Sequence, residues 1–363
     1  MTNKKQPGTT AADIAAASSP KVQELKAQLK TLNQRHRRLA IEAGSISNFF
    51  DEVSDAVTSL PPASKIFRPQ KKDTAKTPAT ACLHLTDWHI GQVTKRSETD
   101  GLGAYSPEIA EGRLDKLGEW LVDWISAKKL TYKVEELQVF CTGDMVHGAL
   151  HEDDLAANAF PPPVQCAWAA RLLAELIGGL AEHLPVKVDF VTVDNHSRLS
   201  KKIQHAGAGL NTFGYTVGHT AELMLRNFTE GEAPRVTFAI HPQVSALVKV
   251  QGFGFKIAHG NHQRGGNTMG IPYYGLSRSV AHAARVAMTH EDKAFNVLMT
   301  GHFHAPARTG SISKSGNADW CVGPALSGPS TYDHSFGRPS PGAQCAWMMT
   351  QQGDQDYNVV TLQ

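Results

Sequence analysis

The alternation of short apolar runs with longer helical patterns most constrains how this chain can fold. Three runs, "TACLHL" at 80–85, "LQVFCTG" at 137–143 and "VKVDFVTV" at 186–193, indicate buried strands. Ser106 and Pro107 mark the start of a helix between the first two runs, and a second helix is expected over about 164–183. Strands separated by helices require right-handed crossovers, so the sequence predicts a largely parallel sheet.

The second half of the chain is richer in strand patterns. The runs "RVTFAIH", "ALVKVQ" and "FKIAH" suggest hairpins with a turn at "GFG", 252–254, and "AFNVLMTGH" and two C-terminal strands near 344–350 and 357–362 follow. We therefore expect an α/β fold, a four-layer α/β/β/α sandwich of two mixed sheets flanked by helices, with an N-terminal helical extension.

The N-terminal part differs in composition from the rest. We expect a disordered N-terminus over 1–19, a helical and possible coiled-coil extension over 20–60, a linker over 61–80, and one domain over 81–363. A heptad-like stripe supports the helix. Its positions are Val22, Leu25, Leu29, Leu32, His36 and Leu39. Three roles stay open for this helix: docking on its own domain, homo-oligomerisation through residues 20–45, or contact with nucleic-acid phosphates by its six cations.

Overall composition excludes some classes of protein. The chain has 363 residues, with 36 Lys and Arg against 34 Asp and Glu, so no global basic field indicates a nucleic-acid partner. Five cysteines without C-x-x-C spacing are typical of reduced thiols. The start lacks an apolar signal segment and we find no long uninterrupted apolar stretch, so we expect a cytoplasmic protein of a bacterium or a phage-infected host, without a membrane span.

Polar residues follow the apolar strands at five places. These strand ends supply Asp87 and His89, then Asp144, then Asn195 and His196, then His259, and finally His302 and His304. Strand ends in an open α/β sheet face one crevice, so all five can deliver side chains to a single pocket. Each residue also has an ordinary explanation, such as a hydrogen-bonded core histidine for His259 or a helix cap for Asp144. The ordered set favours a metal site.

This set, D-x-H, G-D, N-H, a lone H and G-H-x-H, resembles the calcineurin-like metallophosphoesterase superfamily. The contexts "GALHEDDLAAN" and "HGNHQRGG" are similar to phage-encoded nuclease-like members and to SbcD-type DNA exonucleases. The resemblance implies two metal ions. It assigns one ion to Asp87, His89 and His304, the other to Asn195, His259 and His302, with Asp144 bridging both. It makes His196 the catalytic residue.

The expected chemistry follows from these residue types. Imidazole and carboxylate ligands without thiolate suit Mn²⁺, our preferred assignment, or Fe or Zn²⁺. Two carboxylates leave about two positive charges of the two ions uncompensated, which favours a phosphate ester and a bridging hydroxide as nucleophile. His196 can protonate the leaving oxygen. Candidate substrate-phosphate contacts are His147, Arg198 and Arg264.

One residue departs from the family pattern. Asp194 stands where a glycine usually precedes Asn-His, and an aspartate can adopt the left-handed conformation more readily than most residues. The substitution can also perturb Asn195.

The sequence predicts a metal-dependent phosphodiesterase, with DNA as the preferred substrate. A small-molecule phosphodiesterase acting on cyclic nucleotides is the alternative. A non-catalytic coiled-coil binding module is a third reading, which the intact ligand set disfavours.

Overall fold

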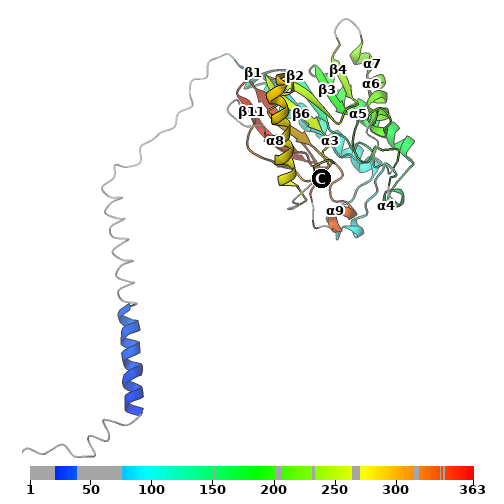
Figure 1. Cartoon of the computed structure of the whole chain (residues 1–363). Helices are drawn as coiled ribbons and strands as arrows, with labels where there is room; N and C mark the ends of the chain where they lie inside the picture. The colour runs from blue at the N-terminus through cyan, green and yellow to red at the C-terminus, as the bar shows by residue number, and fades with distance from the viewer. Residues whose placement is uncertain are drawn as a thin grey trace, which may run out of the picture. The chain divides into compact units, whose positions relative to one another are not determined.

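The computed structural model describes residues 21–38, 76–150, 152–200, 207–230, 234–263, 270–313, 319–335, 337 and 340–363. The chain divides into two units, Met1–Lys72 and Asp73–Gln363. In the first unit residues 21–38 form a helix, drawn in blue in Figure 1. Its stripe residues Leu25, Leu29 and Leu32 are all exposed. The calls for residues 1–19 and for 39–75 lie outside the described residues, and oligomerisation through residues 20–45 stays a prediction.

The larger unit contains a six-stranded mixed sheet, in the order β11-β10-β1-β2-β3-β4. Its central strands β1 (Thr77–Leu85), β2 (Tyr132–Cys141), β3 (Val186–Val191) and β4 (Val236–His241) are parallel. The strands β10 (Ala343–Thr350) and β11 (Gly353–Thr361) form an antiparallel hairpin against β1. The predicted crossover helices are α3 (Pro107–Lys128) and α5 (Pro162–Ala181), and Ser106 Oγ caps α3 by accepting the Ile109 N–H.

The second sheet has five strands, in the order β5-β6-β7-β9-β8. It comprises β5 (Ser245–Val250), β6 (Phe253–Ala258), β7 (Val297–Thr300), β8 (Ala307–Arg308) and β9 (Asp319–Val322). The middle strands β6, β7 and β9 are parallel, and the outer pairs are antiparallel. This sheet is also mixed.

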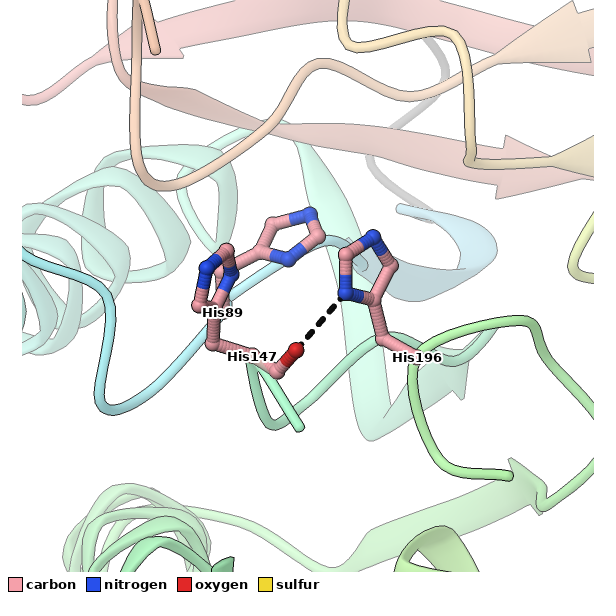
Figure 2. A group of neighbouring side chains, drawn as sticks. All are labelled: His89, His147 and His196. Atoms are coloured by element: carbon pink, nitrogen blue, oxygen red, sulfur yellow. Dashed lines mark hydrogen bonds between the residues drawn. The ribbon is translucent and has the colours of Figure 1, made fainter. Parts of the chain in front are cut away.

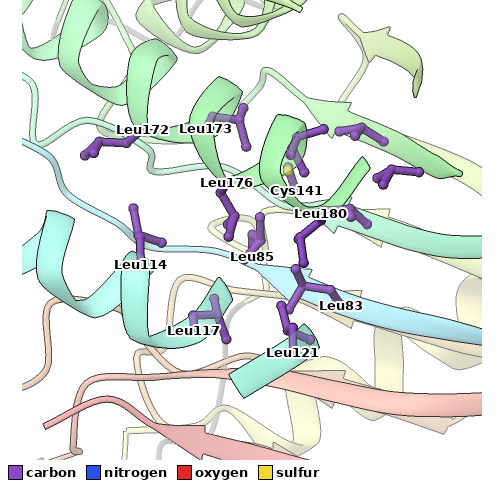
Figure 3. Close-up of a cluster of buried hydrophobic side chains, with 14 of the residues drawn as sticks. Leu83, Leu85, Leu114, Leu117, Leu121, Cys141, Leu172, Leu173, Leu176 and Leu180 are labelled. Carbon is purple, nitrogen blue, oxygen red and sulfur yellow. The ribbon is translucent and has the colours of Figure 1, made fainter. Parts of the chain in front are cut away.

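Helices cover the outer faces of both sheets (Figure 1). Leucines of α3 and α5 pack on Leu83 and Leu85 of β1 (Figure 3). A second core, including Phe140, Phe255 and Trp347, joins the two sheets face to face. A third core lies between the second sheet and α8 (Tyr273–Thr289). The predicted sandwich of two mixed sheets flanked by helices is confirmed.

Short elements complete the larger unit. They are the 3-10 helices η1 (Arg96–Glu98) and η2 (Glu291–Lys293), and the helices α4 (Glu152–Ala156), α6 (Phe213–Met224), α7 (Arg226–Thr229) and α9 (Thr331–Ser335).

Two details of the predicted organisation are wrong. The first strand begins at Thr77, inside the predicted linker. Thr77 and Pro78 are exposed at the start of this strand, a position where a proline is tolerated. The hairpin turn lies at Gln251 and Gly252, both with positive φ, rather than at 252–254, so Phe253 already belongs to β6. Both errors shift boundaries without changing the order of elements.

One helix, α5, is long and apolar enough to cross a membrane by length and composition. Two thirds of its apolar window, 67%, is buried inside the protein. It packs against α3, α6 and the first sheet. This is the environment of a core helix, and the same test is weak evidence for a membrane span.

Candidate metal centre

The polar strand ends meet where the two sheets face each other. The first sheet supplies Asp87, Asp144 and Asn195, and the second supplies His259, His302 and His304. Among the described residues, three groups of side chains each have potential ligand atoms within 4.8 Å of one another. The groups are Asp87, His89 and His304; Asp144, His259 and His302; and His89, His147 and His196. The first group is the trio that sequence reasoning placed around one ion. The second group contains His259 and His302 of the other predicted trio, together with Asp144, the predicted bridging residue.

The first group surrounds Asp87 Oδ1. His304 Nε2 lies 3.5 Å from this oxygen and His89 Nε2 lies 3.8 Å from it. The two imidazole nitrogens are 3.1 Å apart. Asp87 and His89 are buried, whereas the His304 side chain is 17% exposed. A polar cluster therefore opens to solvent on the His304 side.

The second group is centred on His259. Its Nε2 lies 3.0 Å from Asp144 Oδ2 and 2.9 Å from Asn195 Oδ1. The His302 ring meets the His259 ring edge to face, with centroids 5.1 Å apart. The His302 backbone N–H donates to both Asp87 carboxylate oxygens, at 3.1 and 2.9 Å, and thereby connects the two groups.

The donor set fits a bound cation. His259 Nδ1 lies 2.9 Å from the Thr142 carbonyl, to which it must donate, so neutral His259 presents a lone pair at Nε2. That lone pair faces the oxygens of Asp144 and Asn195. Asp144 Oδ2 and His89 Nδ1 are buried without an aligned hydrogen-bond partner. Lone pairs that converge on one another in a buried place need a proton or a metal ion between them.

The electrostatics favour the metal-binding protonation states of His302, His89 and Asp144. At His259 and His304 the lowering effect of burial is outweighed, by Asp144 and by Asp333 respectively, so the pKa of His259 rises to about 9 and that of His304 rises well above its usual value, and a metal ion has to displace a proton there. Burial lowers the pKa of His302 to about 3, with the charge of His259 acting in the same direction. Burial and the neighbouring His196 and His304 hold the pKa of His89 well below its usual value. Burial alone would raise the pKa of Asp144, but His259 and the other imidazoles outweigh it and hold that pKa well below the usual range. Neutral imidazoles and an ionised carboxylate are the forms that bind metals.

The backbone is strained at the predicted ligands. Five of them have a positive φ that is uncommon for residues other than glycine. These are Asp87 (53°), His89 (48°), Asp144 (51°), His302 (69°) and His304 (59°). Such conformations cluster at functional sites, where the fold imposes them to aim side chains.

Two glycines allow this close approach. Gly143 has φ +101°, and a Cβ there would lie 2.8 Å from the Cβ of Asp194 and 3.0 Å from His259 Nδ1. A Cβ on Gly301 would overlap the Thr86 hydroxyl and the Asp87 carboxylate. The glycines in "TGD" and "TGH" therefore let the two sheets bring their ligands together.

Asp194 has a different role from the one that its sequence position suggested. It does not adopt a positive φ, so the expectation that it tolerates the glycine position through a left-handed conformation is wrong. Its buried carboxylate instead accepts the N–H of Asp144 at 3.0 Å, and the N–H and hydroxyl of Ser197 at 2.6 and 2.8 Å. Through these hydrogen bonds Asp194 connects the loop that contains Asn195 and His196 with the loop that contains Asp144.

His196 lies beside His89 and His147 (Figure 2). Its ring centroid is 4.6 Å from that of His89 and 5.4 Å from that of His147. His196 Nδ1 lies 2.7 Å from the His147 carbonyl, to which it donates, and its backbone N–H donates to Asp144 Oδ1 at 3.0 Å. His147 is almost buried, and burial with the nearby His196 lowers its pKa to about 4.

The structure places one of the two remaining candidate phosphate contacts. Arg198 Nε donates to the Asn195 carbonyl at 3.2 Å, so this cation lies next to the ligand loop. Arg264 lies outside the described residues.

Sequence reasoning missed one acidic residue, Asp333 of α9. Its Oδ2 lies 2.9 Å from His304 Nδ1 and accepts the Ser330 hydroxyl at 2.6 Å. Asp333 is 4% exposed. A carboxylate behind a ligand histidine fixes its tautomer and orientation. The motif "SxxD" at 330–333 indicates a turn or cap, and this was the one available signal in the sequence.

No protein-family model matches the chain, and no curated protein matches it. Several solved structures are similar in fold. A conserved uncharacterised protein from Streptococcus pneumoniae, a predicted phosphoesterase, is 11% identical, with 80% of this chain and 99% of that chain covered and a TM-score of 0.29. Wild-type Vps29 from Entamoeba histolytica, complexed with Zn²⁺, is 11% identical, with 78% and 99% covered and a TM-score of 0.27. PhoD is 11% identical, with 80% and 70% covered and a TM-score of 0.37.

Proposed function

We propose that this protein is a metal-dependent phosphodiesterase with two divalent metal ions, and that DNA is its preferred substrate. Asp87, His89 and His304 would hold one ion, Asn195, His259 and His302 the other, and Asp144 both. When bound, such ions supply positive charge for a phosphate ester and lower the pKa of a water molecule.

The carrying observation is the pair of ligand groups joined through Asp144 and Asp87. Within the second group Asp144 Oδ2 lies 3.0 Å from His259 Nε2, and Asp144 Oδ1 accepts the backbone N–H of His196, which belongs to the third group. Asp87 belongs to the first group and accepts the N–H of His302, from the second. Among the described residues, the carboxylates of Asp87 and Asp144 lie within the ligand groups and that of Asp333 contacts the far side of His304, so a centre loaded with two divalent ions keeps a net positive charge that suits an anionic substrate.

His196 is the proposed proton donor. Its Nδ1–H is occupied by the His147 carbonyl, so Nε2 is the atom that can carry a proton to the leaving oxygen. His196 is half-buried at the edge of the cluster, which leaves it in reach of a bound substrate. General acid catalysis of this kind contributes about 10²- to 10⁴-fold in rate.

The preferred metal is Mn²⁺, with Fe and Zn²⁺ as alternatives, because the ligands combine imidazole, carboxylate and amide oxygen without thiolate. Cyclic-nucleotide hydrolysis is the alternative activity, and it uses the same cluster. A non-catalytic binding role is disfavoured because Asp144 and His196 are both present and connected by a hydrogen bond.

The test measures Mn²⁺-dependent cleavage of end-labelled single- and double-stranded DNA, bis-p-nitrophenyl phosphate and cyclic AMP. The wild type is compared with Asp144→Asn, His196→Asn and the distant control Asp115→Asn. We expect DNA and bis-p-nitrophenyl phosphate cleavage by the wild type and the control, and losses of at least 10²-fold in the two site variants. Cleavage of cyclic AMP without DNA would select the alternative, and no cleavage of any diester by metal-loaded protein would refute the proposal.

A further inference from the structure

A pocket of about 380 Å³ lies between α8 and the outer face of the second sheet. Lys256 and Ala258 of β6 line it, whereas the alternate residues Phe255 and Ile257 belong to the core between the sheets. Leu298 of β7 is on the same outer face as Lys256. The pocket therefore lies outside the core between the two sheets, beside the third core, where α8 leaves part of β5 and β6 uncovered.

One end of the pocket lies at the metal end of the sheet. Its lining there includes Gly260, next to the predicted ligand His259, and His262, three residues after His259. Phe295 lies at the other end, since the neighbouring Asn296 N–H donates to the carbonyl of Gly254 near the start of β6. Ser245, also in the lining, pairs with Ala258 at the carboxyl end of β6. A chain-like substrate whose scissile phosphate lies at the metal centre can thus continue into the pocket.

The lining is basic. Lys256, Arg278, His262 and His282 line it, and no described acidic residue does. Within the described part of the chain Lys256 and Arg278 have no carboxylate partner, and each lies near an aromatic ring instead. Lys256 Nζ is 5.7 Å from the centroid of Phe295, and the Arg278 guanidinium carbon is 5.9 Å from that of Tyr274. Burial lowers the pKa of Lys256, as expected for a cation held beside apolar groups.

Cations beside an accessible aromatic ring, here the half-buried Phe295, together recognise single-stranded nucleic acid. The cations contact phosphates and the ring provides a stacking surface for a base. A volume near 380 Å³ is in the range of small-ligand pockets. A small diester has one phosphate, at the metal centre, and cannot use this site.

We propose that this pocket binds the strand on one side of the scissile phosphodiester, so that the substrate is a polynucleotide strand rather than a small diester. The inference rests on the proposed function, since it takes the metal centre as the place of cleavage. Lys256 and Arg278 contact phosphates of that strand, and Phe295, at the end of the pocket away from the metal centre, lies against one of its nucleosides.

The test compares the full-length wild type with Lys256→Ala/Arg278→Ala. The control is Arg226→Ala/Arg235→Ala, which removes the same charge from α7 and from the residue before β4, in the first sheet. KM and kcat are measured on labelled dT12 and on bis-p-nitrophenyl phosphate. We expect KM for dT12 to rise at least tenfold in the pocket variant alone, with bis-p-nitrophenyl phosphate hydrolysis within twofold. The salt slope of dT12 affinity should fall by about 1.4, or 0.7 for each lost phosphate contact.

A second readout separates the pocket from catalysis. Binding of labelled dT12 is followed by fluorescence anisotropy in excess chelator, where no cleavage occurs, and circular dichroism and unfolding midpoints confirm that all variants fold. Weaker binding in the pocket variant than in the control supports the site even if no diester is cleaved, in which case the proposed function fails and the pocket assignment stands. Equal loss in the two double variants, or none, overturns the pocket. Binding of thymidine monophosphate as tight as that of dT12 also overturns it, since the pocket would then serve a free nucleotide.

Discussion

His304 Nδ1 donates to Asp333 Oδ2 across 2.9 Å, and this fixes His304 with its Nε2 toward His89 and Asp87. The carboxylate is held in turn by the Ser330 hydroxyl and N–H. Asp333 lies 29 residues after His304, in a short helix outside both sheets. We regard it as a positioning residue for the first ligand group.

Asp333→Asn is expected to weaken metal binding about 10- to 100-fold. The asparagine amide makes a weaker hydrogen bond to the His304 imidazole than the carboxylate does, and it carries no negative charge. The measurement is Mn²⁺ titration by calorimetry. The matched control is Asp100→Asn. It removes an exposed carboxylate whose Oδ2 lies 3.1 Å from Nε2 of His334, the residue that follows Asp333. Equal metal affinity in the wild type and Asp333→Asn would contradict a positioning role, and a drop in both variants would indicate a general charge effect.

Metal removal should lower stability as well as activity. The buried lone pairs of Asp144, His259 and Asn195 face one another, so a cation bound to the folded state alone stabilises it by about 2.7 kcal/mol at 100 times its Kd. We expect Tm to rise when Mn²⁺ is added to chelator-treated protein. Asp144→Asn should gain much less under the same conditions. An unchanged Tm in the wild type would show that these residues hold no such ion.

Gly143→Ala should disrupt the centre. The new methyl group would lie 2.8 Å from the Asp194 Cβ in a backbone conformation, φ +101°, that alanine rarely adopts. We expect a destabilisation of about 2 kcal/mol, together with loss of tight metal binding. Gly179→Ala is the contrasting change, since a Cβ there meets nothing within 4 Å in helix α5. It should leave metal binding intact and stabilise the protein by up to about 1 kcal/mol, as measured by urea unfolding.

The strands and the primary candidate ligands were predictable because both follow from local patterns. In a segment such as "LMTGHFH", the apolar residues that predict a strand and the polar residues at its end lie within a few positions of each other. The carboxyl ends of neighbouring parallel strands lie at the same edge of a sheet. The sequence could therefore indicate which residues converge. It could not give their distances, and the role of each ligand remains a prediction.

Other parts of the site depend on contacts that no local pattern contains. Asp333 comes from the later helix α9, and its contact with His304 depends on where that helix lies in the fold and not on spacing along the chain. Asp194 was recognised as unusual, but its role as an acceptor for the Asp144 N–H appears once β2 and β3 are aligned. The pocket at Lys256 likewise exists because α8 covers one part of the second sheet and leaves another open.

His84 should make the protein sensitive to acid. This histidine is fully buried in β1, its Nε2 lies 2.8 Å from the Thr142 hydroxyl, and burial lowers its pKa to about 4 from an ordinary 6.5. Above pH 6.5 the ring is neutral in both the folded and the unfolded chain, so it has no effect on the pH dependence of stability. Between pH 6.5 and 4 the unfolded chain binds a proton that the folded chain excludes, so the free energy of unfolding falls as pH falls. The total loss approaches about 3 kcal/mol below pH 4, and about 2 kcal/mol of it is present at pH 5.

His84→Gln keeps a hydrogen-bonding group without this titration. Urea unfolding of both proteins at pH 7.5 and 5, in chelator, should show the variant losing about 2 kcal/mol less than the wild type, and parallel losses would show that His84 does not titrate in this way.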